Sequence, residues 1–265
     1  MRVVWMAYDT LHKILSLKVL IMSLAVVLAI VFVCLVMSDY MTAAEPAWHD
    51  LFREHISRSY IGNIYFFAQM LLTPFIVIIS TLAAHDMYRG EAEQIYLTGG
   101  LRKPVAFIGR MLGMLVYILV LWWTLFLVAG FVLIFTGLGN IDLSMVDVFV
   151  KLSINSVAIS LFAYFLVGLT KVAITGILPI LLAQYWLTVN SNITLDTAGS
   201  ALHNAVNYLL PLNTFSRFAE VDIEYFDLLM QYQDLAPWHG SLLLITFALF
   251  LFLASLELYI TKQDQ

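Results

Sequence analysis

Charged residues are scarce in this chain. Asp, Glu, Lys and Arg make up 12% of its 265 residues, whereas a soluble domain carries about 25%. Hydrophobic residues reach 62%, so too little polar surface remains to cover a soluble fold of this length. Between Arg110 and Asp142 the chain runs for 31 residues without a charge. Because about 20 apolar residues cross a hydrocarbon core roughly 30 Å thick, the composition predicts a polytopic membrane protein.

Cysteine and the motifs of nucleotide and metal chemistry are also lacking. The single cysteine, Cys34, lies inside an apolar stretch, which excludes a disulfide within the chain and favours a packing role. No G-x-x-x-x-G-K-[ST] sequence occurs, so the chain has no P-loop for ATP phosphates. His49 and His55 would lie on nearly opposite faces of a helix, which disfavours a metal site. We therefore expect no enzyme, no cofactor or metal bound by this chain, and no nucleic-acid partner.

Six uncharged apolar stretches are long enough to span a membrane. Runs of this length must be helical, because every backbone amide in lipid needs an internal partner. The sequence thus predicts an all-α membrane protein in which residues 1–265 form a single transmembrane domain. Lys171 alone separates the fourth stretch from the fifth, which predicts a very tight turn with this side chain at the membrane surface. The stretches are residues 19–37, 61–84, 111–141, 152–170, 172–195 and 240–256.

The distribution of basic residues predicts that both termini are cytoplasmic. With the N-terminus inside, nine Lys and Arg residues fall on the cytoplasmic side and four on the outer side, which is the expected asymmetry. The inner nine are Arg2, Lys13, Lys18, Arg89, Arg102, Lys103, Arg110, Lys171 and Lys262, and the outer four are Arg53, Arg58, Lys151 and Arg217.

Residues 1–14 have an amphipathic pattern. Apolar residues recur every three to four positions, with Arg2, Asp9 and Lys13 between them. This pattern predicts a helix lying along the cytoplasmic interface, with Trp5 and Tyr8 at headgroup depth. The alternative is that these residues simply extend the first span.

Residues 85–104, between the second and third spans, have the punctuation of a short helix. Glu91 and Glu93 stand in its first turn, where carboxylates complement the helix dipole. The pair Gly99-Gly100 supplies a left-handed residue to end it, and Pro104 stands in the first turn of the next helix. With an apolar patch at residues 95–97, the segment suits docking to another protein. The alternative is a solvated connecting loop.

The longest polar stretch, residues 190–239, is predicted on the outer side. Within it, residues 201–218 are apolar at helical spacing but too short to form two full spans. They predict two re-entrant half-helices that meet at Pro211 and line a polar mouth. The acidic residues nearby either favour cationic substrates or only keep this face soluble.

A few polar and small residues within the spans suggest contacts between helices. Gln69, Asn155 and Gln184 favour hydrogen bonds between helices over substrate contact, and they are weak candidates for a translocation path. Gly109 and Gly113 predict a close helix approach at the base of the third span.

The chain resembles a known family in residues 85–104. The run Asp86-x3-Gly90-Glu91-x-Glu93, followed by Leu97-Thr98-x2-Leu101-x-Lys103, is similar to the cytoplasmic segment of the type-2 ABC exporter permeases. The length, the N-in/C-in layout, the amphipathic start and the long outer segment before the last span resemble that family too. The sequence departs from the family pattern at two places. The proline usual in the coupling segment is replaced near Gly100, and Gln94-Ile95 stands where the family has Gly-Thr.

The resemblance implies the permease subunit of an ATP-driven exporter in a bacterial cytoplasmic membrane. Two permease chains, identical or related, would form the path for an amphipathic, lipid-like or peptide substrate, and separate ATPase subunits would bind ATP and Mg²⁺. The alternative is a non-transporting membrane protein such as an immunity or assembly factor. An ion-driven transporter is disfavoured because no charged residue lies at mid-span. The residues implied to contact the ATPase are Asp86, Arg89, Gly90, Glu91, Glu93, Ile95, Tyr96 and Leu97.

Overall fold

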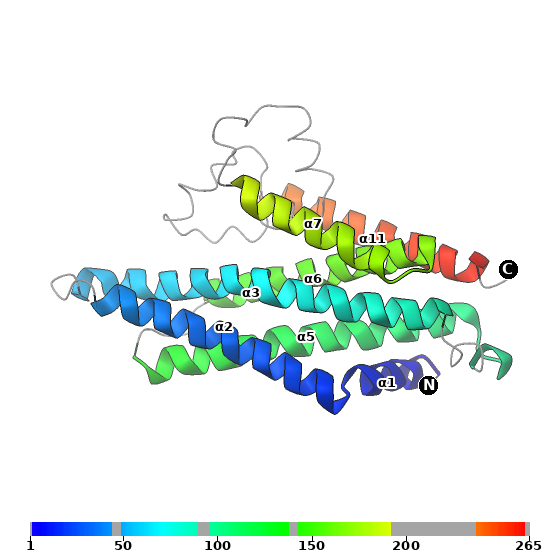
Figure 1. The fold of residues 1–265 in the computed structure, drawn as a ribbon, viewed down its shortest axis with the longest axis horizontal. Helices are drawn as coiled ribbons and strands as arrows, with labels where there is room; N and C mark the ends of the chain where they lie inside the picture. The colour runs from blue at the N-terminus through cyan, green and yellow to red at the C-terminus, as the bar shows by residue number, and fades with distance from the viewer. Residues whose placement is uncertain (1, 44–48, 90–95, 138–142, 192–236, 263–265) are drawn as a thin grey trace.

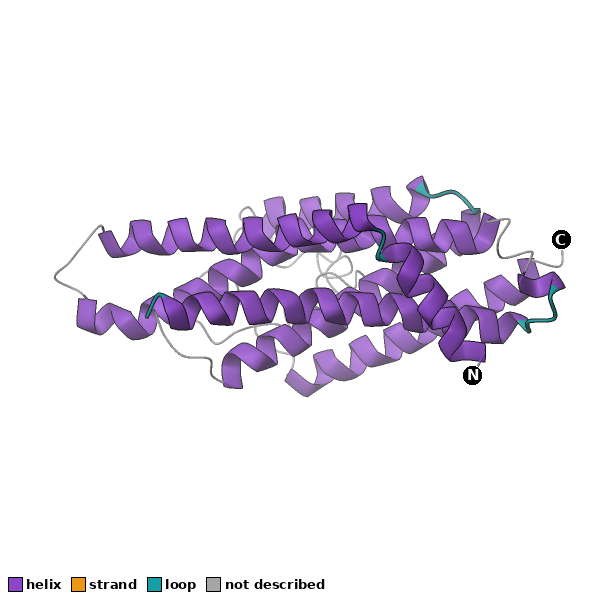
Figure 2. Cartoon of the chain, turned by 90° about the horizontal axis from the view of Figure 1, so that it is seen from below, coloured by secondary structure: helices purple, strands orange, loops and turns teal. Residues whose placement is uncertain are grey.

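The computed structural model is helical throughout the parts of the chain that it describes. These parts are residues 2–43, 49–89, 96–137, 143–191 and 237–262, and no strand occurs in them (Figure 2). The prediction of an all-α protein is confirmed for these residues. The helices are α1 (Arg2–Ile14), α2 (Leu17–Ala43), α3 (His49–Arg89), α5 (Lys103–Phe135), α6 (Leu143–Thr170), α7 (Ile174–Ser191) and α11 (Pro237–Lys262).

The long helices lie side by side, with α1 as a short helix at one end of the bundle (Figure 1). Both chain termini lie at this end, together with the end of α3, the start of α5 and the turn between α6 and α7 (Figure 1). We call it the terminal end. Because α1 stops at Ile14 and α2 begins at Leu17, the alternative that residues 1–14 simply extend the first span is wrong.

Among the residues that the structure describes, three segments are long and apolar enough to cross a membrane: Leu17–Val36, Leu71–Arg89 and Lys103–Phe135. In the described parts of α6 and α11, shorter apolar helices run over Ser156–Thr170 and Ile245–Thr261. Three such spans suggest a membrane protein. The predicted count of six spans goes beyond this finding and belongs to the proposal below.

Two helices differ from the predicted spans at their ends. Helix α3 begins at His49 rather than at residue 61, because charged residues do not end a helix, and Pro74 lies inside it. Helix α5 ends at Phe135 rather than at residue 141, because Gly137 adopts a positive φ of 70° two residues later. At its start, Pro104 stands in the first turn of α5, as predicted.

The turn at Lys171 is as tight as predicted. Helix α6 ends at Thr170, α7 begins at Ile174, and the Lys171 amide donates to the Val167 carbonyl at 2.7 Å. Lys171 itself has a φ of 58°, a left-handed conformation in which glycine is more usual.

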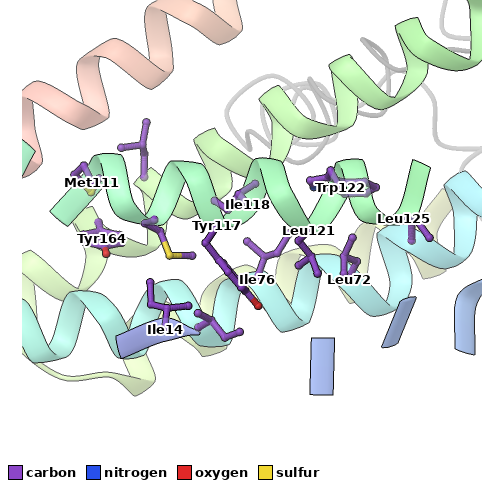
Figure 3. Close-up of a cluster of buried hydrophobic side chains, with 14 of the residues drawn as sticks. Ile14, Leu72, Ile76, Met111, Tyr117, Ile118, Leu121, Trp122, Leu125 and Tyr164 are labelled. Carbon is purple, nitrogen blue, oxygen red and sulfur yellow. The ribbon is translucent and has the colours of Figure 1, made fainter. Parts of the chain in front are cut away.

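The core surrounds α5. Buried Tyr117, Leu121 and Trp122 of α5 lie close to Leu72 and Ile76 of α3 (Figure 3). Hydroxyl groups supply the hydrogen bonds between helices here. Trp122 Nε1 donates to Ser156 Oγ of α6 at 2.7 Å, and Ser160 Oγ donates to Ser80 Oγ of α3 at 2.6 Å. Ser23 Oγ of α2 lies 2.8 Å from the Tyr117 hydroxyl. The sequence analysis did not identify these hydroxyls, and the hydrogen bonds that it predicted for Gln69, Asn155 and Gln184 involve side chains outside the description.

Candidate functional site

The structure describes both ends of segment 85–104, on which the expected partner contact depends. Residues 85–89 form the last turn of α3, and residues 96–98 are helical before the turn at Gly99-Gly100. Asp86 and Arg89 are exposed, whereas Tyr96 and Leu97 are half-buried. Of the other expected contact residues, Gly90, Glu91, Glu93 and Ile95 lie outside the described residues.

The structure does not describe how the other candidate residues are placed relative to one another. Gln69, Asn155 and Gln184 belong to α3, α6 and α7, but their side chains lie outside the description. The predicted re-entrant break at Pro211 lies outside the described residues as well. The structure therefore leaves the translocation path and the outer mouth as predictions.

Tyr88 anchors the first end of segment 85–104 among three helices. Its hydroxyl donates to the Ser255 carbonyl of α11 at 3.1 Å, and its ring packs edge-on against Tyr259, with 5.9 Å between centroids. Gly168 of α6 makes room for this side chain, since a Cβ there would lie 2.7 Å from the Tyr88 hydroxyl oxygen. We call Tyr88, Gly168, Ser255 and Tyr259 the Tyr88 cluster. It joins the end of α3 to α6 and α11.

The start of α5 is attached to the same part of α11. Phe107 packs against both Phe252 and Tyr259, at centroid distances of 5.5 and 5.7 Å. Lys103 Nζ donates to the Ile260 carbonyl at 3.1 Å, which places a cation at the C-terminal end of a helix. The last residues of segment 85–104 are thereby tied to α11.

Tyr96 anchors the second end of the segment to α1. Its hydroxyl donates to Asp9 Oδ2 at 3.2 Å, and its ring meets Trp5 edge-on, with centroids 5.5 Å apart. Two cations lie over the ring, with Lys13 Nζ 5.2 Å and Arg110 Cζ 5.7 Å from its centroid. Both distances are within the range of cation–π attraction. We call Trp5, Asp9, Lys13, Tyr96 and Arg110 the Tyr96 cluster.

The backbone at Tyr96 is also fixed. Gly100 has a φ of 83°, the Leu101 amide donates to the Tyr96 carbonyl at 3.2 Å, and the Gly100 amide donates to the Leu97 carbonyl at 3.1 Å. This pair of bonds is the Schellman motif that ends a helix at glycine. The predicted helix end at Gly99-Gly100 is confirmed.

Two glycines of α5 let α1 approach closely. A Cβ added at Gly109 would lie 2.4 Å from the Met6 Cβ, and one at Gly113 would lie 2.6 Å from the Ala7 carbonyl oxygen. The predicted close approach at Gly109 and Gly113 is confirmed, and the partner helix is α1. We call these two residues the glycine seat. Met6, Thr10 and Ile14 form the face of α1 that is buried.

The exposed residues of α1 include three large apolar or aromatic side chains beside Arg2, His12 and Lys13. Val4 is 71% exposed, Tyr8 67% and Trp5 53%. Within the described residues, no group of three His, Cys, Asp or Glu side chains is placed to hold a metal ion. The described contacts at the terminal end attach segment 85–104 to other helices at both of its ends.

Sequence reasoning identified Tyr96 but missed the residues that hold it. The charge pattern places Arg110 among the inner basic residues but does not predict that it is buried beside Asp9. A usable signal exists, because Asp9 is the single acidic residue among the first 38 residues of the chain. No comparable local signal marks the contact of Tyr88 with Ser255. Comparison with known protein families gives no match for this chain, and comparison with curated protein sequences gives none either.

Proposed function

We propose that this chain is the membrane-spanning permease subunit of an ATP-driven exporter of the type-2 ABC class. It crosses a bacterial cytoplasmic membrane six times, with both termini inside. Two permease chains form the path for an amphipathic, lipid-like or peptide substrate, and Gln69, Asn155 and Gln184 contribute polar groups to it. A separate ATPase subunit binds ATP and Mg²⁺ and docks on segment 85–104.

The observation that carries this proposal is the anchoring of segment 85–104 at both ends. Tyr88 contacts α6 and α11, and Tyr96 contacts α1 and, through Arg110, α5. A solvated connecting loop requires neither anchor. A segment fastened to four helices passes a push on its middle residues to the bundle, which is the property that coupling to an ATPase demands.

The arrangement of the terminal end supports the proposed orientation. Both termini lie beside segment 85–104 (Figure 1), as an even number of crossings requires. With this end in the cytoplasm, nine of the thirteen Lys and Arg residues are cytoplasmic, in agreement with the positive-inside tendency.

Purification of the tagged full-length chain from its native membranes tests the proposal. A subunit with a Walker motif is expected to co-purify in equimolar amount. The double change Glu91→Ala, Glu93→Ala and the single change Ile95→Asp should each deplete that subunit, because a buried ion pair that loses one partner costs about 3–5 kcal/mol. Glu54→Ala, on the predicted outer side, is the matched control and should leave co-purification unchanged.

Two outcomes would count against the proposal. If no Walker-motif subunit accompanies the unmodified chain, the protein is not an ABC permease, and a non-transporting role becomes the better reading. If the subunit accompanies all the variants equally, segment 85–104 is only a connector.

A further inference from the structure

Arg110 is a buried cation at the start of the long uncharged run of α5. It is 7% exposed, and its Nη1 lies 3.5 Å from Asp9 Oδ2 and 3.3 Å from Thr10 Oγ1. A buried arginine is tolerated when a carboxylate and further hydrogen bonds compensate for lost hydration. Both of these contacts come from α1. Helix α1 therefore supplies a charge that α5 requires.

One carboxylate oxygen of Asp9 contacts side chains from α1, α5 and segment 85–104. Its Oδ2 accepts from the Tyr96 hydroxyl at 3.2 Å and lies 2.9 Å from Lys13 Nζ and 3.5 Å from Arg110 Nη1. The two cations that flank Asp9 also lie over the Tyr96 ring. The position of Tyr96 is thus defined relative to the ion pair between α1 and α5, and the glycine seat fixes the spacing of those two helices.

We propose that Asp9 and Arg110 are positioning residues for the Tyr96 end of segment 85–104. Their ion pair sets where Tyr96 lies. A role of this ion pair in coupling rests on the proposed function, whereas the contacts among Asp9, Arg110 and Tyr96 do not. A displacement of the segment that moves Tyr96 removes a hydrogen bond from Asp9 and an aromatic face from Arg110, so α1 and α5 respond to the position of the segment.

A distance measurement on the full-length chain tests the proposal without an ATPase. Nitroxide labels are attached at Tyr8→Cys on α1 and Gly99→Cys on the segment, in a Cys34→Ala background. The chain is reconstituted into vesicles of phosphatidylethanolamine and phosphatidylglycerol. With Asp9 and Arg110 intact, one narrow distribution of distances is expected. Asp9→Asn and Arg110→Met should each broaden it, whereas Arg110→Lys should retain much of the narrow component because it keeps the charge.

The controls separate positioning from a general effect of charge or folding. Arg102→Met removes a positive charge from the exposed residue just before α5 and should leave the distribution narrow. The double variant Asp9→Asn, Arg110→Met should be no broader than the worse single variant, because both changes remove the same interaction. A second label pair within α5, at Leu112→Cys and Phe131→Cys, should keep its distance in every variant and so report that α5 remains helical.

The outcomes discriminate between the two proposals. An unchanged distribution in Asp9→Asn and Arg110→Met overturns the positioning role. Broadening in those two variants alone supports it, even where no ATPase subunit is found and the permease function fails. Where the ATPase is present, the same two variants should lower substrate-stimulated hydrolysis about 5-fold or more, the lower end of couplings between linked sites. If the distances between the labels broaden but substrate-stimulated ATP hydrolysis is unchanged, the ion pair has no role in coupling.

Discussion

The two ends of segment 85–104 are held by different chemistry. The Tyr88 cluster is buried among α3, α6 and α11 and consists of aromatic packing and one hydrogen bond to a carbonyl. The Tyr96 cluster combines an aromatic pair with one acidic and two basic side chains, and Lys13 remains 45% exposed. Apolar packing is insensitive to salt, whereas exposed ion pairs are screened by it. The first end should therefore respond little to salt, whereas the second should respond to salt through the exposed Lys13.

The largest effects are expected when a side chain is added at the glycine that gives each anchor its space, Gly168 at the Tyr88 end and Gly113 at the Tyr96 end. Gly168→Val should destabilise the whole bundle by about 1–3 kcal/mol, because the added Cβ meets the buried Tyr88 side chain. Gly113→Val meets the backbone of α1 instead, so α1 should leave its seat while the other helices remain folded. Thermal unfolding in detergent measures the first effect, and thiol labelling of Met6→Cys in a Cys34→Ala background measures the second.

Leu112→Val, at an exposed neighbouring position, is the control for both glycine variants and should change neither measurement. Equal losses of thermal stability in Gly168→Val and Gly113→Val would show that α1 is as integral to the bundle as α6 and α11. The contrast between the two ends would then be wrong.

Removal of either tyrosine hydroxyl should lower stability less than the glycine variants do, and the loss should again be larger at the Tyr88 end. Tyr88→Phe leaves the buried Ser255 carbonyl without this donor and should cost about 1 kcal/mol of stability. Tyr96→Phe should change stability much less, because Asp9 keeps Lys13 and Arg110 as partners. Thermal unfolding of the two variants side by side checks this, and a larger loss for Tyr96→Phe would reverse the ranking.

The smallest expected effect concerns Lys13. Its contact with Asp9 spans one turn of an exposed helix surface, and such pairs contribute about 0.3–0.5 kcal/mol. Lys13→Met should therefore increase thiol labelling of Met6→Cys slightly at low salt. In about 1 M salt, where the screening length is about 3 Å, the difference from the unmodified chain should disappear. A difference that persists in high salt would mean that Lys13 acts through packing.

Local signals in the sequence predicted local structure well. Gly100, Pro104 and Lys171 each mark a helix end or turn that the structure contains, because backbone conformation at such positions depends on neighbouring residues. Gly109 and Gly113 predicted a close approach but not its partner, since a small residue shows only that some helix comes near. The missed end of α5 was also marked locally, by Gly137, but the absence of charge was given more weight.

The contacts that define the site were beyond local signals. The pairing of Asp9 with Arg110 and of Tyr88 with Ser255 joins residues that are far apart in the chain, and periodicity carries no information on such pairs. The roles of Glu91, Glu93 and Ile95 and the break at Pro211 rest on pattern and resemblance, and they stay predictions.

The glycine seat also constrains the order in which the protein is assembled. Helix α1 is synthesised before α5, so Thr10 cannot meet Arg110, which is 100 positions later in the chain, until α5 has begun to be made. At a synthesis rate of about 5–20 residues per second, this interval lasts about 5–20 seconds. During that time the glycine seat and Arg110, which Met6 and Thr10 contact in the folded bundle, have not yet been made. Helix α1 therefore reaches its native contacts only after the start of α5 has been synthesised.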